Sequence, residues 1–213
     1  MFQWSTNLFW IIVTAFGYGL LMPLFISAYV YDFSGYYNFN WLKKIDLYNS
    51  KPKQIININA GFDETSYMLK NHFPESNLKV FDFYNAQQHT EKAIIRARKV
   101  SLVYPNTEQI KFNIIPLKDN SVDIIFLLSA VHEIRSLQEK IEFLKECHRL
   151  CKPNGTVIMV EHLRDLPNFL AFSIGFTHFF SRKTWKKAYK SAGFLIFNET
   201  KFTPFMSVFN SKP

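Results

Sequence analysis

Charged residues are missing from the first 31 positions of this 213-residue chain, and Asp32 is the first of them. The chain also has only two cysteines, Cys147 and Cys151, and it contains no internal repeat and no low-complexity segment. Two thiols four residues apart provide no disulfide framework, so a reducing compartment fits best. The length is sufficient for one domain with a sizeable core and a short extension.

The two cysteines flank His148, which raises the question of a metal site. Two thiols and one imidazole within a single helical turn leave the coordination shell of a metal short of partners. We therefore interpret these residues as buried helix positions and expect no metal.

Composition identifies a folding sequence, because 48% of the residues are apolar and 20% are charged. Aromatic residues reach 17%, with 23 phenylalanines, which indicates apolar surface facing a membrane, a lipophilic ligand or a partner. The formal net charge of +8 has two broad explanations, nucleic acid or an anionic membrane surface.

The uncharged N-terminal stretch is typical of a membrane anchor. Its apolar part, Leu8–Val30, would span about 35 Å as a helix, enough for the hydrocarbon core of a bilayer. Trp4 and Trp10 near one end, with Tyr29 and Tyr31 at the other, resemble interfacial aromatic anchors. A cleaved signal peptide is disfavoured, because no basic residue precedes the apolar run and no small-residue cleavage site follows it.

We expect residues 1–31 to be a hydrophobic membrane-anchor segment, residues 32–52 a linker and residues 53–213 the folded domain. Pro23 and the pair Gly17 and Gly19 are expected to kink the anchor or to break it into two short pieces. A helix lying on the membrane and a helix buried against its own domain or a second copy remain alternatives. Four lysines that follow the segment place the domain on the cytoplasmic side: Lys43, Lys44, Lys51 and Lys53.

The rest of the chain alternates strand and helix signals. The pattern predicts strands at 54–59, 78–83, 109–115, 122–128 and 156–160, helices at 64–72, 90–100, 137–151 and 181–192, and two extended runs after Gly193. A Pro/Gly turn at 152–155 is expected to separate the third of these helices from the strand that follows. This alternation predicts an α/β fold with a mostly parallel sheet, helices on both faces and ligands at the carboxyl ends of the strands.

Three stretches carry a family resemblance. PLKDNSVDIIFLLSAVHEI, LKECHRLCKPNGTVIMVEH and VFDF resemble the segments around the fourth, fifth and second strands of class I S-adenosylmethionine (SAM) methyltransferases. The chain is most similar to the small methyltransferases of ubiquinone, menaquinone and lipid modification, over roughly Lys53–Pro213. The resemblance implies a Rossmann-like fold, SAM as cofactor, and Asp82 as the residue that binds the ribose hydroxyls.

The first loop departs from the family pattern D-x-G-x-G-x-G. Asn57 takes the place of the leading aspartate, and Gly61 is the one glycine that remains. SAM presents a methionyl amino acid to this loop and no pyrophosphate, so a phosphate-binding nest is not required. Asp63 and Glu64 are expected at the first turn of the next helix, where one of them contacts the methionyl ammonium or both only cap the helix. The resemblance assigns cofactor binding to Asn59, Ala60, Gly61, Asp63, Asp82 and Ser129.

Methyl transfer from a sulfonium is an in-line displacement that needs an aligned nucleophile and often a general base. His132 and Glu133 follow the fourth strand, Glu161 and His162 follow the fifth, and His178 lies further on. A histidine suits the base role, and we assign catalysis to His132, Glu133 and His178. Each also has a structural explanation, helix capping for the glutamates and core hydrogen bonding for the histidines. Nearby, Arg164 and Asp165 are expected to form a local ion pair.

The basic helix at 181–192 carries four lysines on one face: Lys183, Lys186, Lys187 and Lys190. This face is a solvated surface, a contact for anionic lipid headgroups or, third, a contact for RNA, for which no recognised motif is present.

Together these features predict SAM-dependent methylation, on oxygen rather than carbon, of a small lipophilic acceptor at the cytoplasmic membrane face. The expected partners are this substrate and membrane lipid, with no nucleic acid. The alternatives are a non-catalytic scaffold that keeps the fold, a nucleic-acid methyltransferase and, more weakly, a NAD(P)-dependent enzyme.

Overall fold

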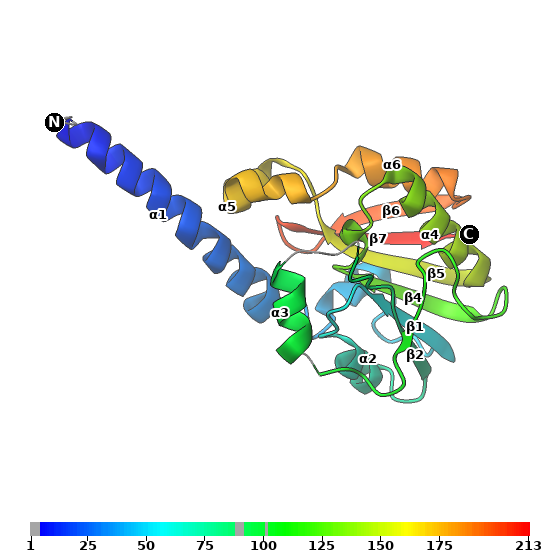
Figure 1. Cartoon of the computed structure of the whole chain (residues 1–213). Coiled ribbons are helices and arrows are strands. Elements are labelled where there is room, and N and C mark those ends of the chain that lie inside the picture. Colours follow the sequence, from blue (N-terminus) through cyan, green and yellow to red (C-terminus); the bar gives the residue numbers. More distant parts are fainter. Residues whose placement is uncertain (1–4, 88–91, 101) are drawn as a thin grey trace.

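A computed structural model describes residues 5–87, 92–100 and 102–213. A seven-stranded sheet forms its centre, in the order β3-β2-β1-β4-β5-β7-β6 (Figure 1). All neighbours pair in parallel except β7, which is antiparallel to both β5 and β6. The strands are β1 (Gln54–Asn59), β2 (Asn77–Asp82), β3 (Glu108–Gln109), β4 (Val122–Leu128), β5 (Cys151–His162), β6 (Ile196–Lys201) and β7 (Met206–Lys212).

Helices cover both faces of the sheet, as predicted. Two amphipathic helices, α4 (Leu137–Leu150) and α6 (Arg182–Ser191), bury their apolar sides in one core, where Cys147 lies. The opposite core holds α2 (Ser66–His72) and the segment before β1, including Trp41 and Leu42 of the 3-10 helix η2 (Asn40–Ile45). Residues 32–52, expected as a linker, therefore contribute part of the core.

The strand and helix predictions hold with small shifts at the ends, apart from two regions. Strand β3 covers two residues, so the expected strand at 109–115 is mostly wrong; an isolated bridge joins Lys111 and Ile114 instead. The turn expected at 152–155 lies inside β5, which begins at Cys151 and shifts register where it passes this bulge. Helix α3 (Lys92–Val100) agrees with the expected basic helix, whose first two residues lie outside the described part.

The N-terminal helix α1 (Thr6–Ala28) projects away from the sheet (Figure 1). It runs through Gly17, Gly19 and Pro23 without a break, so the expected division into two pieces is wrong. The helix continues into a π-helical turn, η1 (Tyr29–Phe33), and Val30 in that turn is the first fully buried residue. Cys147 and Cys151 are free and buried, as expected, but only Cys147 is a helix position, because Cys151 begins β5.

Candidate functional site

The loop after β1 turns at Gly61, which has a φ of +94°. The Oδ1 atom of Asn59 accepts a hydrogen bond from the Gly61 backbone N–H at 3.0 Å. A Cβ at position 61 would lie 2.6 Å from Nη1 of Arg98 and 2.8 Å from the ring of Tyr84. The remaining glycine of the loop is thus required both by backbone angle and by space.

Asp63 caps the helix that follows. Its Oδ1 accepts hydrogen bonds from the backbone N–H groups of Thr65 and Ser66, each at 3.0 Å. Asn57, which replaces the aspartate of the family pattern, donates through Nδ2 to the hydroxyls of the same two residues, at 3.0 and 2.9 Å. The loop is therefore stabilised by side chains where the family uses glycines.

Within the described part of the chain, two buried polar atoms at this loop have no hydrogen-bond partner: Nδ2 of Asn59 and Oδ2 of Asp63. An unpaired buried donor or acceptor costs about 1–3 kcal/mol, so such atoms commonly mark a ligand. One is a donor suited to a carboxylate, and the other is an acceptor suited to an ammonium. The pair fits the zwitterionic amino-acid end of SAM, and Asp63 both caps the helix and offers a free oxygen.

Asp82 lies at the end of β2, buried, where the resemblance places the ribose ligand. Its carboxylate is engaged: Oδ2 accepts from Nη1 of Arg98 at 2.7 Å and from Nε2 of Gln109 at 2.6 Å, and Oδ1 accepts from the backbone of Tyr84. Arg98 also donates to the Gly61 carbonyl at 3.0 Å, and its guanidinium lies 4.2 Å from the centre of the Tyr84 ring. Arg98 of α3 therefore occupies the space beside the Asp82 carboxylate, and the cavity left there measures about 90 Å³.

A larger cavity of about 430 Å³ opens between the ends of β1 and β4. Ser129, directly after β4, lines it with φ +51°, and its hydroxyl oxygen lies 3.4 Å from the hydroxyl of Tyr36. Ala60 is buried beside the loop and does not line it. We call this space the tyrosine cavity; its lining is Tyr31, Tyr36, Tyr37, Asn57, Asn59, Phe62, Glu64, Thr65, Leu128, Ser129 and His132.

The three tyrosines come from the segment after α1 and were missed by sequence reasoning. Burial raises the pKa of Tyr31 to about 12. Burial, followed by the hydrogen bond from its hydroxyl to Glu64, also raises the pKa of Tyr37. All three stay protonated donors near neutral pH. The aromatic run GYY next to the anchor was the available signal.

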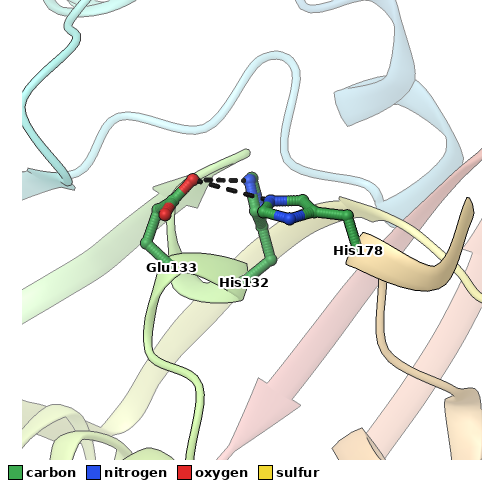
Figure 2. A group of neighbouring side chains, drawn as sticks. All are labelled: His132, Glu133 and His178. Atoms are coloured by element: carbon green, nitrogen blue, oxygen red, sulfur yellow. Dashed lines mark ion pairs between the residues drawn. The ribbon is translucent and has the colours of Figure 1, made fainter. Parts of the chain in front are cut away.

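The predicted catalytic residues lie close together (Figure 2), and His132 is the one of the three that lines the tyrosine cavity. His132 and Glu133 form the 3-10 turn η3 (Val131–Glu133), and His178 ends the 3-10 helix η4 (Ser173–His178). The Oε1 atom of Glu133 lies 3.2 Å from Nε2 of His132 and 3.7 Å from Nε2 of His178. We call these three residues the His–Glu–His cluster.

Glu161, at the end of β5, holds the cluster from behind. Its Oε2 lies 2.8 Å from Nδ1 of His132, and its Oε1 accepts from the backbone N–H groups of Val131 and His132. Burial lowers the pKa of His132, but the charges and hydrogen bonds of Glu161 and Glu133 outweigh it and raise the pKa to about 10. Hydrogen bonds from His132 and His178 hold the pKa of Glu133 well below its usual range.

The remaining candidates have structural roles. Nδ1 of His162 lies 3.0 Å from both the Asn168 side-chain oxygen and the Phe205 carbonyl, and burial lowers the pKa of His162. The expected Arg164–Asp165 ion pair is wrong. Arg164 donates to backbone carbonyls of the η4 region, whereas Asp165 caps α5 (Leu166–Phe172) and pairs with a distant lysine, Lys201.

Comparison with known proteins agrees with this geometry. Residues 59–159 match the model of a family described as a methyltransferase domain. The fold is similar to a SAM-dependent methyltransferase from Aquifex aeolicus, with a TM-score of 0.59 and 19% identity over 89% of this chain and 97% of the other. It is also similar to human N-acetylserotonin methyltransferase in complex with SAM, with a TM-score of 0.58 and 15% identity over 90% of this chain and 55% of that one.

One curated relative is a highly reducing polyketide synthase from Pyrenophora dematioidea, 31% identical over 91 residues. The match covers 36% of this chain and 3% of the synthase, so this chain spans only a small part of that relative. The matched domain, the strand order and the fit of the first loop to a methionyl group lead to one assignment. Residues 59–159 carry a methyltransferase domain, the chain has the fold of the class I methyltransferases, and both support a SAM-dependent methyltransferase with S-adenosyl-L-methionine as the methyl donor.

Proposed function

We propose that this protein transfers a methyl group from SAM to an oxygen atom of a small lipophilic acceptor at the cytoplasmic face of a membrane. One observation carries the proposal. The exposed apolar surface of α1 continues onto α5, and the chain leaves α5 through η4, which brings His178 into the His–Glu–His cluster.

The anchor is supported by its length and exposure. Thr6–Phe33 is a continuous helix of 28 residues, its most apolar window of 18 residues has a mean hydropathy of 2.0, and none of that window is buried. A core helix of similar composition would be mostly buried, whereas no residue of this window is buried within the described chain. Exposed apolar area on this scale is typical of a membrane or partner contact.

Helix α5 lies beside α1 and extends the same surface (Figure 1). The hydroxyl of Tyr18 donates to the Leu170 carbonyl at 2.5 Å. The side chains around this contact face outward, with Leu166 67% and Ile174 81% exposed. A lipophilic molecule dissolved in the bilayer would therefore meet an apolar approach that ends near His178.

The reaction that fits the cavity is an in-line displacement. The acceptor hydroxyl releases its proton to solvent, and a lone pair of its oxygen forms the new C–O bond. The electron pair of the broken S–C bond goes to sulfur, which leaves S-adenosylhomocysteine. Asn59 and Asp63 would hold the amino-acid end of the donor, Asp82 the ribose, and the His–Glu–His cluster the acceptor hydroxyl.

Titration calorimetry with S-adenosylhomocysteine tests the donor half of this proposal. We expect saturable binding by the full chain in detergent or nanodiscs. No binding at millimolar concentration would favour the second candidate, a non-catalytic scaffold, for which the Arg98–Asp82 pair beside the ribose position is the specific observation.

Charges placed on the anchor test the membrane half. A double variant, Leu20→Lys with Leu24→Lys, alters two exposed positions of α1, and each lysine at the bilayer centre costs about 2.5–3.5 kcal/mol. We expect this variant to leave the membrane fraction, whereas Leu195→Lys, at an exposed leucine before β6, remains there. Equal partition of the double variant and the control would contradict membrane attachment through α1.

A further inference from the structure

The His–Glu–His cluster brings three metal-ligating groups to one point. Nε2 of His132, a carboxylate oxygen of Glu133 and Nε2 of His178 all lie within 4.8 Å of one another (Figure 2). The separations that involve Glu133 are 3.2 and 3.7 Å. Ligand bonds of about 2.0–2.1 Å around a tetrahedral zinc ion place neighbouring ligand atoms about 3.4 Å apart. The two separations from Glu133 are thus near the spacing that one such ion needs, and the histidine ligand atoms lie within 4.8 Å of each other.

A buried carboxylate orients the first of these ligands. Oε2 of Glu161 lies 2.8 Å from Nδ1 of His132, which leaves Nε2 directed at Glu133 and His178. Histidines that bind metals usually have such a carboxylate on their other ring nitrogen, where it fixes the tautomer and raises the basicity of the ligand. Glu161 is 1% exposed, so it cannot change this direction freely.

A second contact holds the two supporting turns together. Nη1 of Arg135 donates to the carbonyl of His132 at 3.0 Å and to the carbonyl of His178 at 2.9 Å. One guanidinium thereby joins η3 to η4, although these turns are more than 40 residues apart. The ligands are therefore placed in advance, and an ion would not have to order them on binding.

We propose that His132, Glu133 and His178 bind one divalent transition-metal ion of the zinc type. Two imidazoles and one carboxylate are a set of ligands that zinc uses in catalytic sites, whereas magnesium and calcium prefer oxygen ligands throughout. The charges also balance, because the two positive charges of the ion are matched by the carboxylates of Glu133 and Glu161.

The ion would have an open position toward the acceptor. Three protein ligands are typical of catalytic zinc sites, whose fourth position holds water or substrate. The cluster borders the tyrosine cavity through His132, so this position lies where the proposed function, on which this step depends, puts the acceptor hydroxyl. A bound hydroxyl would release its proton to solvent more readily and attack the methyl carbon as the deprotonated oxygen.

Cobalt(II) is a probe that reports on this site without any turnover. The full chain in nanodiscs is stripped with a chelator, titrated with Co²⁺ and followed by visible absorption, and its zinc content after exposure to Zn²⁺ is measured by mass spectrometry. We expect one ion per chain and the absorption of a four- or five-coordinate Co²⁺ site.

Three variants locate the ion. His178→Gln and Glu133→Gln should each remove the Co²⁺ spectrum, and Glu161→Gln should weaken binding about 10- to 100-fold, as loss of an outer carboxylate does. His148→Gln, at a half-buried histidine of α4 outside the cluster, should bind like the original chain. Circular dichroism and titration with S-adenosylhomocysteine check that each variant is folded.

The outcomes separate this inference from the proposed function. Absence of stoichiometric binding, or a spectrum that His178→Gln leaves unchanged, would overturn the metal site even if S-adenosylhomocysteine binds. Stoichiometric Co²⁺ that depends on the cluster, in a chain without affinity for S-adenosylhomocysteine, would instead support the site and refute the donor half of the proposed function.

Discussion

The two sides of the candidate site are built in opposite ways. On the side of β1 and β2, the carboxylate of Asp82 already accepts hydrogen bonds from Arg98 and Gln109. On the side of β4 and β5, His132, Glu133 and His178 turn their donor atoms toward one point (Figure 2). The donor side is thus closed by its own side chains, whereas the acceptor side is prepared to hold something further.

This difference indicates which side of the site loses binding free energy to an existing contact. In the proposed function, the ribose of the methyl donor has to displace Arg98 from Asp82, so donor affinity would be reduced by the free energy of that ion pair. On the acceptor side the two histidines pair with Glu133 inside the cluster, and Glu161 and Arg135 hold both histidines in place for a bound ion or acceptor. Changes on the two sides should therefore affect donor binding very differently.

The largest expected effect is that of Gly61→Val on the donor side. A Cβ there meets Arg98 and Tyr84 at under 3.0 Å, and the φ of +94° is unfavourable for valine. We expect the affinity for S-adenosylhomocysteine in calorimetry to fall by more than about 100-fold. Gly17→Val is the control, since nothing lies within 4 Å of a Cβ at that position; a Gly61→Val chain that binds normally would exclude this loop from the donor site.

Asp82→Ala should have the next largest effect. Hydrogen bonds to a charged group contribute on the order of 1.5–3 kcal/mol, and this carboxylate would accept hydrogen bonds from both ribose hydroxyls. We expect a corresponding loss of S-adenosylhomocysteine affinity. Unchanged affinity in a folded Asp82→Ala chain would remove this residue from the site, and with it the ribose position that the comparison assumes.

On the acceptor side, the buried side chain of Lys140 should make the free energy of unfolding depend on pH. The ammonium of Lys140 donates to the Ile134 carbonyl and lies 3.4 Å from the centre of the Phe180 ring. Burial, with Arg135 nearby, lowers the pKa of Lys140 to about 7. Between pH 7 and about 10 the unfolded chain holds the extra proton, so this residue adds to stability as pH rises, by up to about 1.4 kcal/mol per pH unit.

Denaturant titrations at pH 7 and pH 8 measure this effect. The free energy of unfolding should increase with pH more in the original chain than in Lys140→Met, which lacks the titrating group. Parallel changes in the two chains would show that Lys140 keeps its proton in the folded state. Comparison of the two chains also removes the contributions of other groups that titrate in this range.

The smallest expected effect on S-adenosylhomocysteine affinity is a gain, opposite in sign to the losses at Gly61 and Asp82. Arg98→Gln removes the competitor for Asp82, and because the arginine side chain is 33% exposed, the lost ion pair is worth about 1 kcal/mol or less. We expect S-adenosylhomocysteine to bind a few times more tightly to this variant. Weaker binding would mean that Arg98 contacts the ligand itself, and the donor side would then be prepared in the same way as the acceptor side.

Sequence reasoning found the elements whose signals are local. The apolar run of β4, the periodicity of α4 and the acidic end of β2 each predict a strand or helix within a few residues, and their alternation predicts a mostly parallel sheet. Strand β3 was placed too long because its two residues depend on pairing with β2 rather than on their own sequence. The bulge in β5 has the composition of a turn, and only its neighbours keep it in the sheet.

The site was predictable to the extent that it lies at strand ends. Ser129 and His132 follow directly from the position of β4, and Gly61 from that of β1. The approach of His178 to Glu133 was not predictable, because the two residues are joined only through α5 and η4, whose course depends on contacts with α1. Arg98 was missed for a different reason, because the sequence of a basic helix does not show which of its residues turns inward.

The π-helical turn at Tyr29–Phe33 has a practical consequence for work with this protein. It joins the anchor helix directly to the lining of the tyrosine cavity, where the hydroxyl oxygen of Tyr31 lies 3.4 Å from Nε2 of His162. A shortened chain that begins after Phe33, of the kind often prepared for crystallisation, would lack Val30 from the core and Tyr31 from the cavity lining. Solubility gained in that way would come with an incomplete pocket, so a truncation that keeps the pocket whole has to begin before residue 29.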